Sequence, residues 1–184
     1  MLSLKKMIEH ITADLQKDPR NKEYPFTQKV VEWINKLTPS PSEALLLAAW
    51  GHTLQRWAIE RKTYPMNPKG YHQWRKVLSE LSAKETESIL KSENYPEEII
   101  HRVKELILKT TFPKDPESRV LEDADCLAFL ELKFESYISE WDETKYIRIL
   151  QGTLEKMTPQ AQEFAKKLSY SPEAQALLNK ALET

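Results

Sequence analysis

The chain has 184 residues, of which 11 are prolines and only 3 are glycines, and its 27 basic and 28 acidic residues leave a formal net charge of −1. This length fits one domain, whose folding would hide roughly 70% of the surface of the unfolded chain. So few glycines exclude Gly-rich phosphate loops, dinucleotide-binding fingerprints and nucleophile elbows, because each needs clustered glycines. The near-neutral charge is untypical of a dedicated nucleic-acid binder, so we expect no DNA partner.

The cysteine count and the hydropathy pattern indicate where the protein works. Its one cysteine, Cys126, cannot form an internal disulfide, which favours a reducing cytoplasm and excludes zinc sites built on paired cysteines. No apolar stretch reaches the ~20 residues of a membrane span, and no signal-peptide core is present. We therefore expect a cytoplasmic protein without membrane contact, whose oligomeric state the sequence does not indicate.

Helical periodicity runs along the chain. Apolar residues recur at spacings of three and four, as in Val30, Trp33 and Ile34, and no clear run alternates with period two. The sequence therefore predicts an all-α fold, a single compact multi-helix domain over residues 1–184. Helix starts are indicated where a capping residue precedes a proline, because the cap accepts a free backbone N–H and proline tolerates the first helical position. These pairs are Ser40-Pro41, Asn67-Pro68, Asp115-Pro116, Thr158-Pro159 and Ser171-Pro172. The expected spans are 3–17, 25–38, 41–61, 68–80, 82–93, 96–110, 116–139, 143–156, 159–168 and 172–182.

A histidine lies at the end of an apolar run. Residues 44–51 are apolar all round, so the expected helix 41–61 should be buried on most sides. On that helix His52 would share a face with Ala48 and Arg56. Two interpretations are open for His52: a core histidine bonded to a carbonyl or carboxylate, or a functional group such as a metal ligand.

A carboxylate lies on the apolar stripe of the expected helix 116–139. Asp123 follows Val120 by three residues and precedes Leu127 by four, so it should face the core. A buried carboxylate needs a cation, a metal or several hydrogen-bond donors, and pairing with an arginine is the structural alternative. Glu122 and Asp125 fall on neighbouring faces, and we expect them to be solvated.

The segment from residue 50 to residue 76 is strongly basic and rich in aromatic residues. It holds six basic residues against one acid, Glu60. Guanidiniums bind phosphate or carboxylate through paired N–H donors, and aromatic rings can stack on a base. The candidate ligand-binding residues are Arg56, Trp57, Arg61, Tyr64, Tyr71, Trp74 and Arg75. Residues 121–145 have the opposite balance, with eight acids against two lysines. The two segments could pair inside the fold, form a pocket for a phosphorylated small molecule, or offer a surface to RNA or a protein.

Two stretches resemble a known superfamily. Residues 43–54, Glu-Ala-Leu-Leu-Leu-Ala-Ala-Trp-Gly-His-Thr-Leu, are similar to the central helix of HD-domain metal-dependent phosphohydrolases, and residues 121–127 to the later helix that supplies the last aspartate ligand. This resemblance implies an HD-like fold, with His52 and Asp123 as candidate catalytic residues that hold a divalent metal and activate water. Thr53 replaces the aspartate of the HD motif, and no histidine lies at 26–28, so two of the four usual ligands are missing.

A more specific resemblance covers nearly the whole chain. The segments that carry it are Ser42-Glu-Ala-Leu, Arg56-Trp-x-Ile-x-Arg61, Tyr64-Pro-Met, Gly70-Tyr-His-x-Trp-Arg75, Leu121-Glu-Asp, Cys126-Leu-x-Phe-Leu-Glu131 and Lys156-Met. They resemble an HD-like family known as domain of unknown function 4202. The histidine of that family falls on Thr53 here, and its usual proline is replaced by Glu60. This family name implies a fold and no activity.

The sequence as a whole predicts an HD-like helical protein that binds a nucleotide or another phosphorylated small molecule. Metal-dependent phosphohydrolase activity with an incomplete ligand set is the enzymatic form of this hypothesis, and a non-catalytic protein- or RNA-interaction module is the alternative. With so few glycines, any phosphate must be held by side chains, chiefly arginines. Gly51 and Gly70 are positions where a missing side chain would allow a close approach.

Overall fold

The computed structural model describes residues 4–183, and every regular element within that range is helical. The α-helices are α1 (Leu4–Leu15), α2 (Glu23–Leu37), α3 (Glu43–Gly51), α4 (Pro68–Ser92), α5 (Glu97–Leu108), α6 (Pro116–Leu132), α7 (Glu143–Leu154), α8 (Pro159–Lys166) and α9 (Pro172–Leu182). The described residues also form three short 3-10 helices: η1 (Arg56–Ala58), η2 (Arg61–Thr63) and η3 (Glu135–Tyr137). The all-α prediction is confirmed. None of the described helices combines the length and the apolar character that a membrane crossing requires.

Four of the five predicted cap–proline pairs begin helices. Each of these caps accepts a backbone N–H with its side-chain oxygen, and proline follows it in the first turn; they are Asn67, Asp115, Thr158 and Ser171. The fifth pair, Ser40-Pro41, was wrong. The cap of α3 is Ser42, whose hydroxyl accepts the N–H of Leu45 at 3.1 Å.

The predicted helix 41–61 ends ten residues early, at Gly51. Beyond it the chain turns sharply, and Gln55 takes a left-handed conformation with φ of 59°. The turn is fastened to α4, because the buried hydroxyl of Ser82 donates to the Leu54 carbonyl at 2.7 Å. The prediction that His52 and Arg56 share a helical face is therefore wrong, because the two residues lie on either side of this turn.

Two further boundaries differ from the sequence prediction. The expected helices 68–80 and 82–93 are one continuous helix, α4, because Ser82 bonds to another segment instead of capping a new helix. The expected helix 116–139 ends at Leu132, where Lys133 is the C-cap and η3 follows. The first residue of the expected helix 3–17, Ser3, lies outside the described residues.

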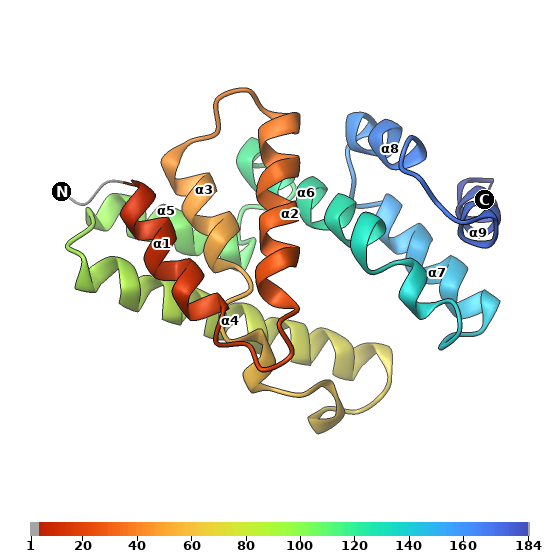
Figure 1. Cartoon of the computed structure of the whole chain (residues 1–184), viewed down its shortest axis with the longest axis horizontal. Coiled ribbons are helices and arrows are strands. Elements are labelled where there is room, and N and C mark those ends of the chain that lie inside the picture. Colours follow the sequence, from red (N-terminus) through yellow and green to blue (C-terminus); the bar gives the residue numbers. More distant parts are fainter. Residues whose placement is uncertain (1–3, 184) are drawn as a thin grey trace.

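Helices α2 and α6 pack together at the centre of the molecule (Figure 1). On one side lie α1, α3, α4 and α5, and on the other lie α7, α8 and α9. The long helix α4 packs along α5, and α3 also packs on α5. The two segments of opposite charge meet in this arrangement, because η1 and α4 carry the basic residues and α6 carries the acids.

Two glycines permit close approaches beside the basic segment. A Cβ on Gly51 would lie 2.3 Å from Thr86 Oγ1, so α3 can approach α4 only with glycine there. A Cβ on Gly70 would lie 2.1 Å from the backbone oxygen of Pro65. Both distances are far below van der Waals contact, which agrees with the close approaches expected at these positions.

Candidate functional site

His52 is buried at the C-cap of α3 and bonds in two directions. Its Nδ1 lies 2.6 Å from the Ala49 carbonyl oxygen, and its Nε2 lies 3.2 Å from Asp125 Oδ1 on α6. Both partners are acceptors, so the ring makes both hydrogen bonds only when each nitrogen carries a proton. These contacts match the interpretation of His52 as a core histidine bonded to a carbonyl and a carboxylate.

Asp123 is buried and bonds to the start of α8. Its Oδ1 accepts the backbone N–H of Thr158 at 2.8 Å, and its Oδ2 accepts the Thr158 hydroxyl at 2.6 Å. Burial raises the pKa of Asp123, and the two bonds from Thr158 oppose the rise. A buried carboxylate was expected to need several hydrogen-bond donors or an arginine. Asp123 has two donors, and both belong to Thr158.

Glu122 and Asp125 are not solvated, contrary to expectation. Glu122 is buried and forms ion pairs with Lys109 and Lys156. Asp125, with a side chain only 15% exposed, receives the His52 bond and lies 3.9 Å from Arg75. Burial alone would raise the pKa of Asp125, but the His52 bond and the nearby positive charges hold it well below its usual range.

Arg56 begins η1 and is the least satisfied charged group of the site. Its side chain is only 12% exposed, and its nearest carboxylate oxygen, on Glu23, is 3.7 Å from Nη1. The Nε atom of Arg56 is buried and has no hydrogen-bond partner among the described residues, and the same is true of the Oε2 atom of Glu23. Burial and the like charge of Arg75 lower the pKa of Arg56. The guanidinium is thus held where its charge is costly.

Arg75 reaches the same place from α4. Its Nη2 lies 3.9 Å from Asp125 Oδ2, which is an ion pair but too long for a hydrogen bond. Burial lowers its pKa, but Tyr71 and Asp125 outweigh this effect, so the pKa is raised overall. Tyr71 lies one turn before Arg75 on α4, and its ring is largely exposed.

A third cation comes from the end of α6. Lys133 lies with its ammonium 3.7 Å from the ring centroid of Phe26, and the Arg56 guanidinium lies 6.0 Å from the same centroid. We refer to Arg56, Arg75 and Lys133 as the cation cluster. Glu23 and Asp125 are the acids that face it. One more positive than negative charge is therefore gathered between α2, η1, α4 and α6, before His52 is counted.

The other predicted ligand-binding residues have structural contacts. Arg61 donates to the carbonyls of Tyr64, Pro65 and Asn67 and lies over the rings of Tyr71 and Trp74. Trp74 donates its indole N–H to the Ile59 carbonyl at 2.9 Å, and Trp57 packs against the core. These contacts fasten the loop between η1 and α4, which positions Arg56 and Arg75 relative to each other.

The predicted metal ligands do not form a recognisable centre. No group of three or more His, Cys, Asp or Glu side chains within residues 4–183 is arranged to hold a metal ion. His52 bonds to Ala49 and Asp125, whereas Asp123 bonds to Thr158. The catalytic and metal-binding roles of His52 and Asp123 therefore stay predictions.

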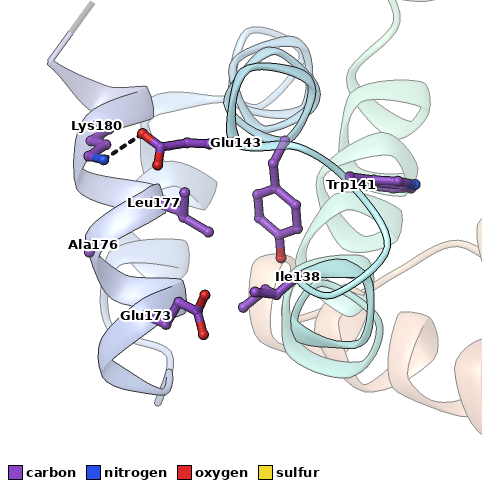
Figure 2. A pocket seen from close by; sticks show the side chains of 8 residues that line it. Ile138, Trp141, Glu143, Glu173, Ala176, Leu177 and Lys180 are labelled. Atoms are coloured by element: carbon purple, nitrogen blue, oxygen red, sulfur yellow. Dashed lines mark hydrogen bonds and ion pairs between the residues drawn. The ribbon is translucent and has the colours of Figure 1, made fainter.

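A cavity of about 320 Å³ lies between η3, α7 and α9 (Figure 2). Leu177 and Ile138 form part of its wall, and an ion pair joins Glu143 to Lys180 beside it. None of the ligand-binding residues predicted from the sequence lines this cavity.

Sequence reasoning missed three members of the site: Glu23, Asp125 and Lys133. Lys133 carried a signal, because it is one of only two bases in the acidic segment 121–145. Nothing in the sequence distinguished Glu23, because an acidic residue in the first turn of a helix is common. Asp125 was assigned to solvent because helical spacing alone does not show that His52 and Arg75 would pack against that face of α6.

Comparison with known proteins gives a family and no activity. A family model described as Domain of unknown function (DUF4202) matches residues 5–178. The chain belongs to this family, as its residues had indicated. No curated protein and no solved structure gives a significant match.

Proposed function

We propose that this protein binds a phosphorylated small molecule at the cation cluster, with the guanidiniums of Arg56 and Arg75 as the phosphate ligands. One observation carries the proposal: Arg56 is almost buried, yet its Nε has no partner in the described part of the chain. Native proteins rarely leave a buried charged donor unsatisfied. An arginine in this state is typical of a site that an anion completes.

The charge balance of the cluster favours an anion. Burial and the charge of Arg75 disfavour the guanidinium of Arg56, and Glu23 and Asp125 contact the two arginines only at 3.7 and 3.9 Å. A phosphate monoester offers three acceptor oxygens and can take paired N–H donors from each arginine. The buried Oε2 of Glu23 also lacks a partner, so it can accept a hydroxyl of the same ligand.

The part of the ligand beyond its phosphate would meet an aromatic surface. Tyr71 is 46% exposed and lies one turn from Arg75, and its ring is 6.0 Å from that of Trp74. A nucleoside or a sugar could stack there, because ring faces accept bases and apolar sugar faces alike. A nucleotide is therefore the first ligand class to test.

The HD-like resemblance adds an enzymatic possibility to this proposal. His52 is joined to the cation cluster through Asp125, whereas Asp123 bonds to Thr158. Hydrolysis of the bound phosphate with a divalent metal is a separate outcome of the test. Binding itself does not depend on it.

Thermal unfolding with pyrophosphate and with panels of nucleotides and sugar phosphates tests the proposal. A ligand at 100 times its Kd stabilises the folded state by about 2.7 kcal/mol, which should raise the Tm by roughly 5–10 °C for a chain of this size. Arg75→Ala should abolish the rise, and Arg148→Ala, at an exposed position on α7, should keep it. Phosphate release measured with added Mg²⁺ or Mn²⁺ reports whether the bound ligand is also hydrolysed.

Two results would contradict the proposal. One is that no phosphorylated compound shifts the Tm. The other is that Arg75→Ala and Arg148→Ala give equal shifts, because the anion would then bind elsewhere. Tight RNA binding with a steep salt dependence would instead favour the interaction-module alternative.

A further inference from the structure

Lys133 is directed into the protein, although it lies at the end of a helix. It is the C-cap of α6, where its backbone N–H donates to the Phe129 carbonyl. Its ammonium lies 3.7 Å from the ring centroid of Phe26, a buried residue of α2. Within the described residues, the side chain of Lys133 forms neither a hydrogen bond nor an ion pair. Apart from its contact with the Phe26 ring, the half-buried amine has no partner there.

Every element around Lys133 contributes a charge. Glu23 lies on α2, Arg56 on η1, Arg75 on α4 and Asp125 on α6. Burial lowers the pKa of Lys133 to about 8, the two arginines lower it, and the two acids oppose them. At pH 7 about a tenth of the side chain is therefore the free amine, which is the nucleophilic form and is far scarcer at the ordinary lysine pKa.

We propose that Lys133 forms a Schiff base with a phosphorylated aldehyde, whose phosphate is held by Arg56 and Arg75; this rests on the function proposed above. The amine lone pair attacks the carbonyl carbon, and a proton moves from nitrogen to oxygen to give a carbinolamine. Loss of water then forms the C=N bond. The net change is amine plus aldehyde to imine plus water, so no oxidant or reductant is needed. The arginines supply the specificity, because they hold the phosphate beside the amine.

The chain contains a matched control lysine. Lys36 Nζ lies 4.2 Å from the ring centroid of Trp33, so it has the same kind of ring contact as Lys133. Lys36 is exposed and does not belong to the cation cluster. A difference in reactivity between the two lysines therefore measures burial and the neighbouring arginines, and not the ring contact.

Reductive trapping tests the inference. The full chain is incubated near neutral pH with pyridoxal 5′-phosphate and then with borohydride, and peptide mass spectrometry measures the rate of labelling at each lysine. We expect Lys133 to be labelled at least about tenfold faster than Lys36, because a pKa lowered by two units or more raises the amine fraction over a hundredfold and the lower basicity offsets only part of that gain. Pyridoxal without its phosphate should lose this preference, and Arg75→Ala should reduce it.

Two measurements separate this inference from the proposed function. Lys133→Arg removes the nucleophile, so the adduct at residue 133 should be lost. The thermal shift that pyrophosphate gives the wild-type protein reports phosphate binding independently of any adduct. Equal labelling of Lys133 and Lys36 in a protein that pyrophosphate stabilises would overturn the Schiff base alone. Equal labelling by pyridoxal and its phosphate would overturn the role of the arginines. A wild-type protein that pyrophosphate does not stabilise would contradict the proposed function as well.

Discussion

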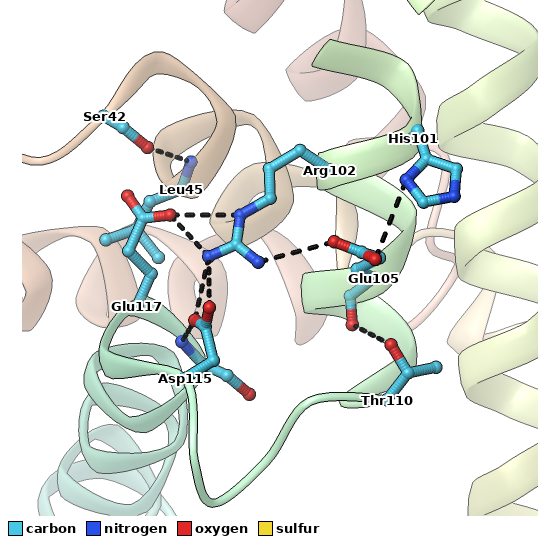
Figure 3. A network of polar contacts seen from close by, with 9 residues as sticks. Ser42, Leu45, His101, Arg102, Glu105, Thr110, Asp115 and Glu117 are labelled. Carbon is cyan, nitrogen blue, oxygen red and sulfur yellow. Dashed lines mark hydrogen bonds and ion pairs between the residues drawn. The ribbon is translucent and has the colours of Figure 1, made fainter. Parts of the chain in front are cut away.

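Arg102 is a half-buried arginine whose hydrogen-bond donors are well supplied with acceptors, whereas Arg56 is almost buried and poorly supplied. Arg102 on α5 donates to both oxygens of Asp115 at 2.8 Å, and to Glu117 at 2.8 and 3.2 Å (Figure 3). Glu105 lies 3.5 Å from its third nitrogen. Arg56 is the more buried of the two, with a side chain 12% exposed against 26%, yet its nearest carboxylate oxygen is 3.7 Å away.

The difference separates an arginine that is satisfied within the fold from the arginine that we propose as a phosphate ligand. Three carboxylates surround the guanidinium of Arg102, and hydrogen bonds to Asp115 and Glu117 raise its pKa against the effect of burial. Arg102 thereby fastens the middle of α5 to the start of α6, where Asp115 also caps the helix. The pKa of Arg56 is lowered instead. A site that holds an arginine in this state is less stable when empty, and it regains that stability when an anion binds.

The largest expected effect is the loss of the Arg102 network. Arg102→Met should reduce the free energy of unfolding by about 2–4 kcal/mol, because three neighbouring carboxylates would lose their common counter-charge. Urea unfolding measures the change, and the m-value should stay constant. Arg148→Met, at an exposed position, should change stability by less than about 0.5 kcal/mol. Equal effects of the two substitutions would remove the contrast between a structural and an available arginine.

The features of this comparison that depend on residues near each other in the sequence were predicted correctly. The features that depend on contacts between distant segments were missed. Asp115-Pro116 correctly predicted the start of α6, because a helix cap depends only on residues that are close together in the sequence. The end of α3 was missed because the turn after Gly51 depends on Ser82, which is 28 residues away from its partner Leu54. For the same reason Arg56 and Arg75 were identified as anion ligands by type, whereas Glu23, Asp125 and Lys133 were not. Those three join the site only through the packing of α2, α4 and α6.

A smaller effect is expected from the pH dependence of stability at Lys133. Its pKa is about 8 in the folded protein, below the ordinary lysine value. Between these two values the unfolded chain binds the proton and the folded chain does not, so stability rises with pH. The gain should be roughly 1–3 kcal/mol between pH 8 and pH 10.5, and Lys133→Met should lack it.

Unfolding by urea at a series of pH values measures this gain as the difference between wild type and Lys133→Met. Lys36→Met is the control, because Lys36 has a similar ring contact but is exposed, and it should keep the wild-type dependence. Parallel curves for wild type and Lys133→Met would show that burial does not lower the pKa of Lys133. The amine would then be as protonated as any surface lysine.

The smallest expected change in stability comes from the most buried arginine. Arg56→Met should change the free energy of unfolding of the ligand-free protein by less than about 1 kcal/mol, in either direction. Two effects oppose each other: methionine avoids the cost of the buried charge, whereas Glu23 loses a distant positive partner. The same substitution should abolish the thermal shift given by pyrophosphate, and it should raise the pKa of Lys133, which the charge of Arg56 helps to lower. A loss of more than about 2 kcal/mol in urea unfolding would show instead that Arg56, like Arg102, serves the fold. Arg56 is therefore where function and stability should separate, because the ligand would need a charge that the fold does not.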